Sequence, residues 1–334
     1  MTEQPTDLPV PSPAEAKDRL EQALFEIRRV IAGQDDMLER VLVCLLAQGH
    51  LLIEGVPGLA KTLTIKTTAG VLGGSFARVQ FTPDLVPSDL VGTRIYRPGE
   101  GAFETELGPV FCNFLLADEI NRAPAKVQSA LLEVMQERQV TIGHTSYPVP
   151  DPFLVMATQN PIESEGTYPL PEAQIDRFML KALIDYPEHD EELTIVQRQL
   201  TAPPELREAL SLEQLKELQR QVFDVYVDPS LVSYAVDLAT ATRRPGPEHA
   251  ERISFGASPR GPISLVQASR ALALVRGRDY VLAEDLQALA KDALRHRLVL
   301  TYQALAEEVT PDAILEKVLD AVPVPKTDLA AGVA

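Results

Sequence analysis

The eight residues from Gly55 to Thr62, Gly-Val-Pro-Gly-Leu-Ala-Lys-Thr, constrain the fold of this 334-residue chain more than any other segment. They follow the short apolar run 51–53 and precede a segment with helical character. A glycine-rich turn between a buried strand and a helix directs backbone N–H groups and the helix N-terminus at one point, which is the geometry that binds phosphate. The pattern therefore predicts an α/β fold with a phosphate-binding loop at a strand end.

The side chains of this loop predict ATP and Mg²⁺ as its ligands. Lys61 supplies a positive charge for the β- and γ-phosphates, and Thr62 supplies a hydroxyl for magnesium. The strict pattern has glycine where this chain has Ala60, and we expect Ala60 to tolerate a helix-start conformation without loss of binding. The predicted nucleotide contacts of this segment are Gly55, Val56, Pro57, Gly58, Leu59, Ala60, Lys61, Thr62 and Leu63.

A pair of acidic residues, Asp118 and Glu119, ends the apolar run 114–117. Carboxylates at the C-terminal tip of a buried strand lie in the ligand crevice of an open α/β sheet. Asp118 is predicted to hold magnesium, directly or through water, and Glu119 to orient the attacking water or take its proton. A role limited to capping the helix that follows is the alternative, and the order of the two motifs along the chain disfavours it.

Strand and helix patterns alternate over the first half of the chain and indicate a mostly parallel, five-stranded sheet with helices on both faces. The predicted strands are 51–53, 77–81, 113–117, 153–158 and 178–183. Segments 92–107 and 138–150 are predicted to be inserted hairpins, and helical periodicity dominates after residue 186. We expect a disordered tail (1–13), an α/β nucleotide-binding core (14–186), a small all-helical domain (187–322) and a flexible tail (323–334).

The charge balance disfavours nucleic acid as a partner, because 48 acidic residues outweigh 31 basic ones and the net charge is −17. Lysine and arginine form no block that could offset this charge. The first 13 residues lack the pattern of a signal peptide, and no apolar run is long enough to cross a membrane. We therefore expect a cytoplasmic protein without direct membrane insertion.

Four segments together resemble the MoxR family of AAA+ ATPases: GVPGLAKT, residues 115–137, residues 156–180 and ASPRG at 257–261. The resemblance is collinear and covers most of residues 25–270. It implies an AAA+ core followed by a helical lid domain, and a ring of identical subunits, a hexamer. It also implies a partner with a von Willebrand factor A domain, and chaperone-like remodelling, maturation or activation of protein complexes driven by ATP hydrolysis.

The resemblance also assigns roles to individual residues. Asn160 is similar to the sensor that hydrogen-bonds the attacking water or the γ-phosphate, although an Asn-Pro turn would also explain it. Arg177 resembles the arginine finger that reaches the ATP of a neighbouring subunit, with a structural salt bridge as the alternative. Arg260 resembles the second sensor, expected to touch the γ-phosphate of its own chain. Ile31 and Gly33 resemble part of the adenine pocket.

Arg122 is a further candidate for the subunit interface, with a local role as the alternative. Three other functions stay open. A metal-chelatase-type motor subunit shares much of the layout. A nucleic-acid motor would need basic hairpins, yet segment 92–107 carries Arg94 and Arg97 against three glutamates. A non-catalytic nucleotide switch is disfavoured because every catalytic residue type is present.

Overall fold

The computed structural model describes residues 12–56, 58–99, 101–161, 166–202, 204–246 and 251–326. Helix α1 (Pro13–Val30) takes in the last residue of the predicted N-terminal tail, and Ser12 and Glu15 form a capping box at its start. Residues 1–11 of that tail, residues 327–334 of the C-terminal tail and Pro57 lie outside the described residues.

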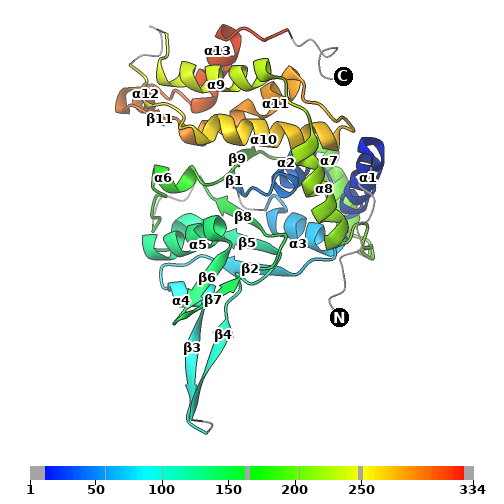
Figure 1. Ribbon diagram of the computed structural model, residues 1–334, viewed down its shortest axis with the longest axis vertical. Coiled ribbons are helices and arrows are strands. Elements are labelled where there is room, and N and C mark those ends of the chain that lie inside the picture. Colours follow the sequence, from blue (N-terminus) through cyan, green and yellow to red (C-terminus); the bar gives the residue numbers. More distant parts are fainter. Residues whose placement is uncertain are drawn as a thin grey trace.

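A five-stranded parallel sheet forms the centre of the molecule (Figure 1), and all five predicted strands are confirmed. Its order is β2 (Phe76–Gln80), β5 (Phe114–Asp118), β8 (Leu154–Gln159), β1 (Leu51–Gly55) and β9 (Leu180–Ile184). The chain leaves β1 toward β2 on one side, whereas β9 lies on the other side of β1. Such a switch point is where open α/β sheets bind ligands, beyond the carboxyl ends of the strands.

Helices cover both faces of the sheet because the strand residues alternate between two apolar clusters. Leu51 and Ile53 pack in one cluster and Leu52 in the other. The first cluster contains α1, α2 (Asp35–Leu46) and α3 (Lys61–Val71), and the second contains α4 (Pro87–Val91) and α5 (Ala125–Glu137).

Both predicted hairpins are present. The first consists of β3 (Gly92–Arg97) and β4 (Ala102–Leu107), and it extends away from the sheet at the end of the molecule opposite α9 and α13 (Figure 1). The second consists of β6 (Gln139–Ile142) and β7 (Thr145–Pro148), which turn at Gly143 with φ +66°. The Tyr147 hydroxyl donates to Thr105 Oγ1 at 3.2 Å, so the two hairpins touch.

The C-terminal part is helical, as predicted. Its helices are α7 (His189–Gln199), α8 (Leu212–Asp224), α9 (Pro229–Arg243), α10 (Arg260–Val275), α11 (Ala283–Leu294), α12 (Tyr302–Ala306) and α13 (Pro311–Ala321). The structure adds a short antiparallel pair, β10 (Ile253–Phe255) with β11 (Val299–Leu300), which an all-helical domain would lack. Strands of two and three residues are too short to show an alternating pattern in the sequence.

Three short elements connect these parts: α6 (Glu172–Ile175) and the 3-10 helices η1 (Ile120–Arg122) and η2 (Arg295–Arg297). The helices of the C-terminal part share one apolar cluster with the α1–α3 face of the sheet. The boundary at residue 187 therefore stays a prediction. Within the part of the chain described, no helix combines the length and apolarity needed to cross a membrane.

Candidate nucleotide-binding site

A cavity of about 420 Å³ opens at the carboxyl ends of β1, β5 and β8. Residue Gly55 and the segment 58–63 line it from the loop and the start of α3. All described loop residues predicted to contact nucleotide therefore meet here, with the exception of Val56, which packs against the apolar core.

Two loop positions adopt left-handed backbone conformations. Gly58 has φ +90°, with open space where a Cβ would stand. Ala60 has φ +56° and ψ +14°, so our expectation of a helix-start conformation at Ala60 was wrong. A left-handed conformation costs an L-residue about 1–2 kcal/mol relative to the right-handed one, and this cost explains why the strict pattern has glycine at this position.

Lys61 begins α3 and its side chain turns back into the loop. The Nζ atom donates to the Gly55 carbonyl at 2.5 Å. Burial lowers the pKa of the Lys61 ammonium, and the nearby carboxylates of Asp118, Glu119 and Glu54 act in the opposite direction. A partly desolvated cation between a backbone loop and carboxylates is suited to a polyphosphate, which would offset the loss of water around it.

Asp118 is held in place by two neighbouring strands. Its Oδ1 accepts a hydrogen bond from Thr158 Oγ1 at 2.6 Å, and its Oδ2 accepts from Arg78 Nη2 at 2.7 Å and Nε at 3.1 Å. Sequence reasoning missed Thr158 and Arg78, which line the cavity from β8 and β2. The parallel register that aligns Gln80 with Asp118 brings these side chains together, and single-strand patterns do not reveal register.

Glu119 has a left-handed backbone, with φ +55°, directly after β5. Its N–H donates to Thr158 Oγ1 at 2.8 Å, and its Oε2 accepts from Gln80 Nε2 at 2.7 Å. Arg122 Nε lies 3.1 Å from the same oxygen, so the candidate interface residue pairs with Glu119 of its own chain in this structure. Strained backbone and two competing donors on one carboxylate are typical of functional sites.

Asn160 lies one residue beyond β8 and lines the same cavity. The residue is buried, with 8% of its surface exposed. The carboxamide thus occupies the rim where the strand ends converge, close to Glu119 in the fold although 41 residues separate them along the chain.

A second cavity, of about 280 Å³, adjoins the first and shares Gly58, Leu59, Ala60 and Leu63 with it. Ile31, one of the two residues predicted to form part of the adenine pocket, lines this cavity. Gly33 does not line it. Instead Gly33 makes the turn between Ala32 and Gln34, with φ +68°, and a Cβ there would stand 2.8 Å from the Glu191 carboxyl.

Helix α7 supplies the opposite wall of the second cavity with Ile195, Arg198 and Gln199. Arg198 Nη1 also donates to the Arg28 carbonyl at 2.8 Å, which fixes α7 against the end of α1. These residues were missed because α7 belongs to the segment assigned to the second domain, and its contact with the loop is a matter of tertiary packing.

The two candidate arginines lie elsewhere, in a third cavity of about 320 Å³. Among the described residues this cavity and the first share no lining residue. Residues 48–50 line it just before β1, and Met179 just before β9, so it lies at the amino ends of the parallel strands. Five residues of strand span about 16 Å, and this length separates the two cavities along β1.

Arg177 and Arg260 both face this third cavity. Arg177 Nη1 donates to the Leu132 carbonyl at 2.9 Å. Arg260 Nη1 lies 3.9 Å from Asp176 Oδ2, and half of the Arg260 side chain is exposed. The expectation that Arg260 touches the γ-phosphate of its own chain is therefore corrected, because the sheet separates the Arg260 side chain from the cavity that the phosphate-binding loop lines.

Comparison with known proteins gives a consistent result. The family described as "ATPase family associated with various cellular activities (AAA)" matches residues 50–180, and the AAA lid domain matches residues 248–318. The protein named Chaperone MoxR1 of Mycobacterium tuberculosis is 56% identical over 92% of this chain and 83% of its own length.

A crystal structure of a candidate ATPase from Cytophaga hutchinsonii superposes with a TM-score of 0.88 at 46% identity, covering 93% of this chain and 96% of that one. A magnesium-chelatase subunit of Arabidopsis thaliana, ChlI-2, is more distant, at 29% identity over 68% of this chain and 52% of its own length.

Proposed function

Because this chain belongs to the MoxR family of AAA+ ATPases, we propose that it hydrolyses Mg²⁺-bound ATP to drive chaperone-like remodelling, maturation or activation of protein complexes. One observation carries the proposal. Lys61, Glu119 and Asn160 come from three separate motifs, yet they line a single cavity together with Asp118. The cavity joins a second one of suitable size for a base, so one nucleotide could occupy both.

The residues of the first cavity divide the chemistry among them. The loop N–H groups and the Lys61 ammonium bind the phosphates. The Thr62 hydroxyl and the Asp118 carboxylate are oxygen ligands of the kind that Mg²⁺ prefers, and the ion would neutralise charge on the phosphates. Glu119 orients the attacking water once its carboxylate turns away from Gln80.

Arg177 and Arg260 would serve a neighbouring subunit. Both lie at the sheet edge opposite to their own nucleotide cavity, and Arg260 is half exposed. A guanidinium brought to the γ-phosphate of an adjacent chain stabilises the charge of the transferring phosphoryl group. This arrangement requires at least two copies, and we infer the ring, a hexamer, from the family.

The partner is a proposal that rests on the family, whereas the location and the absence of a nucleic-acid substrate are proposals that rest on the sequence. We propose a von Willebrand factor A domain protein as partner, a cytoplasmic location and no nucleic-acid substrate. The β3–β4 hairpin supports the last point, because Arg97 pairs with Glu104 and the described hairpin residues carry as many glutamates as arginines. The likeness to a magnesium-chelatase subunit keeps a metal-chelatase motor as the second candidate, which co-purification with a tetrapyrrole-binding subunit would favour.

The test is ATP turnover by the purified protein with Mg²⁺, compared with the Glu119→Gln variant. We expect turnover that Glu119→Gln abolishes while ATP binding is retained. Turnover that persists in Glu119→Gln, or that is absent from both proteins, contradicts the enzymatic proposal. The ATP-trapped Glu119→Gln protein also serves as bait, and failure to retain a von Willebrand factor A domain protein would remove the proposed partner.

A further inference from the structure

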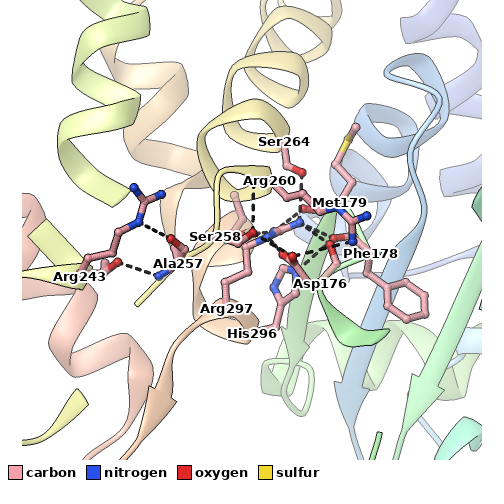
Figure 2. Close-up of polar contacts among 12 residues, drawn as sticks. Asp176, Phe178, Met179, Arg243, Ala257, Ser258, Arg260, Ser264, His296 and Arg297 are labelled. Atoms are coloured by element: carbon pink, nitrogen blue, oxygen red, sulfur yellow. Dashed lines mark hydrogen bonds and ion pairs between the residues drawn. The ribbon is translucent and has the colours of Figure 1, made fainter. Parts of the chain in front are cut away.

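Asp176, the residue before Arg177, joins the core to the lid. It ends α6, and its Oδ1 accepts a hydrogen bond from Arg297 Nε at 2.7 Å. Its Oδ2 accepts from the Ser258 hydroxyl at 2.8 Å. Figure 2 shows the contacts of both lid residues with the Asp176 carboxylate, and Asp176 and Arg260 line the same cavity.

Arg297 is a buried cation that also contacts the backbone of this segment. Only 1% of its side chain is exposed. Its guanidinium donates to three backbone carbonyls around Arg177: those of Asp176 at 3.1 Å, Phe178 at 2.8 Å and Met179 at 3.2 Å. The backbone on both sides of Arg177 is therefore fixed by one side chain of the lid.

The same network reaches the helix that carries Arg260. The Ser258 hydroxyl accepts from the Arg260 backbone N–H at 3.1 Å while it donates to Asp176. Arg297 Nη2 also donates to Ser264 Oγ, on the first turns of α10, at 3.1 Å. Both arginine-bearing segments thus meet at the Asp176–Arg297 pair.

We propose that Asp176 and Arg297 are positioning residues that hold Arg177 and Arg260 as one rigid unit, so that core and lid present the two arginines together to a neighbouring subunit. This inference rests on the proposed function, because it concerns how the shared site is completed. The planar guanidinium of Arg297 satisfies several acceptors at fixed angles, which a lysine ammonium cannot do. Neither positioning residue needs to touch the nucleotide.

Subunit mixing tests the proposal, because it separates the chain that donates arginines from the chain that hydrolyses ATP. The donor carries Lys61→Ala, and the acceptor carries Arg177→Ala. Each alone is expected to be inactive, and their mixture is expected to recover turnover at interfaces where a donor faces an acceptor. If this parent mixture stays inactive, the shared site of the proposed function fails, and this inference fails with it.

Asp176→Asn is then added to either chain. It keeps the size of the side chain and removes its charge. In the donor we expect about a tenfold loss of recovered turnover, because small misplacements of a catalytic group have effects of this size or larger. In the acceptor, whose own Arg177 is already absent, we expect no change. Arg297→Lys in the donor should give a smaller loss in the same direction.

Asp285→Asn is the matched control. Asp285, in α11, is fully buried and is bonded by Arg276 and Arg278. Arg276 caps the far end of α10, about 24 Å from Arg260 along that helix. We expect it to lower thermal stability without a donor-specific loss of turnover. Equal losses from Asp176→Asn in donor and acceptor, no loss in either, or a donor-specific loss from Asp285→Asn would each overturn the proposal.

Discussion

The carboxyl ends and the amino ends of the parallel strands form two opposite sides of the central sheet, which we call the carboxyl edge and the amino edge. Each carries an arginine–aspartate pair, and the two pairs differ in burial. At the carboxyl edge Arg78 pairs with Asp118, and 47% of the arginine side chain is exposed. At the amino edge Arg297 pairs with Asp176, and only 1% of the arginine side chain is exposed. Water can replace the first guanidinium, whereas loss of the second would leave a buried charge without its partner.

This difference separates two tasks. The carboxyl edge offers exchangeable polar groups to a ligand of the same chain. The amino edge offers a fixed frame from which Arg177 and Arg260 face outward. Substitutions at the carboxyl edge should therefore change how a subunit binds its own nucleotide, and substitutions at the amino edge should change how it serves its neighbour.

The largest expected effect comes from Arg177→Ala. We expect kcat to fall about a thousandfold, as for other arginine fingers, with unchanged affinity for a non-hydrolysable ATP analogue. Lys61→Ala, at the other edge, should instead abolish binding of the analogue. Turnover assays and equilibrium binding distinguish the two. If Arg177→Ala weakens binding as much as Lys61→Ala does, the division between the edges is wrong.

Arg260→Ala should have the next largest effect, a loss of turnover of about a hundredfold, because one donor to a developing charge is typically worth this much. The Arg260→Ala protein keeps an intact nucleotide cavity, so mixing it with the Lys61→Ala protein should restore activity. Recovery is measured as turnover against the ratio of the two proteins. A mixture that stays inactive would return Arg260 to a role within its own chain.

The sequence predicted the carboxyl edge well because its residues belong to short motifs at strand ends. Parallel strands bring such ends together, so Lys61 and Asp118 could be assigned to one site from local patterns, and the family resemblance added Asn160. The left-handed conformation of Ala60 was not predicted, although the strict pattern has glycine at this position, because alanine itself rarely adopts that conformation.

The amino edge could not be predicted in the same way. The Asp176–Arg297 contact joins residues 121 positions apart in sequence, and it depends on how the lid packs on the core. For the same reason the position of Arg260 was wrong and the contribution of α7 to the second cavity was missed. Motifs identify residue types, whereas packing between distant segments decides which cavity a side chain reaches.

The amino edge should also be the more sensitive to acid, because His50 is buried beside its cavity. Its Nδ1 accepts from the Val155 N–H at 3.0 Å, and its Nε2 lies 3.1 Å from the Met135 carbonyl. Protonation of His50 Nδ1 would remove the acceptor of the hydrogen bond from the Val155 N–H. Burial, followed by the nearby charge of Arg138, lowers the pKa of His50 from 6.5 to about 3.

The unfolded chain therefore binds a proton at His50 that the folded chain does not, and stability falls as the pH drops below 6.5. Between pH 7 and pH 5 this linkage lowers the free energy of unfolding by about 2 kcal/mol. The glutamine in His50→Gln keeps a hydrogen-bond donor and an acceptor but does not titrate. The loss of stability of this variant between pH 7 and pH 5 should therefore be smaller than that of the original protein by about 2 kcal/mol. Denaturant unfolding at both pH values measures the difference, and parallel pH profiles for the two proteins would rule out His50 as the cause.

The smallest effect is expected at the exposed pair of the carboxyl edge. Arg78→Met removes a positive charge and two hydrogen bonds from Asp118, so the carboxylate becomes more available to Mg²⁺. Because the arginine of this pair is nearly half exposed, the ion pair is weak, and we expect the Mg²⁺ concentration for half-maximal turnover to fall by about threefold.

Arg97→Met is the matched control for this prediction, because Arg97 forms a similarly exposed ion pair with Glu104 in the β3–β4 hairpin, away from the cavity. It should leave the Mg²⁺ titration unchanged. A higher Mg²⁺ requirement in Arg78→Met would show that Arg78 orients Asp118 for the ion instead of competing with it. In that case the exposed pair would be a positioning device like the buried one, and burial would no longer distinguish the functions of the two edges.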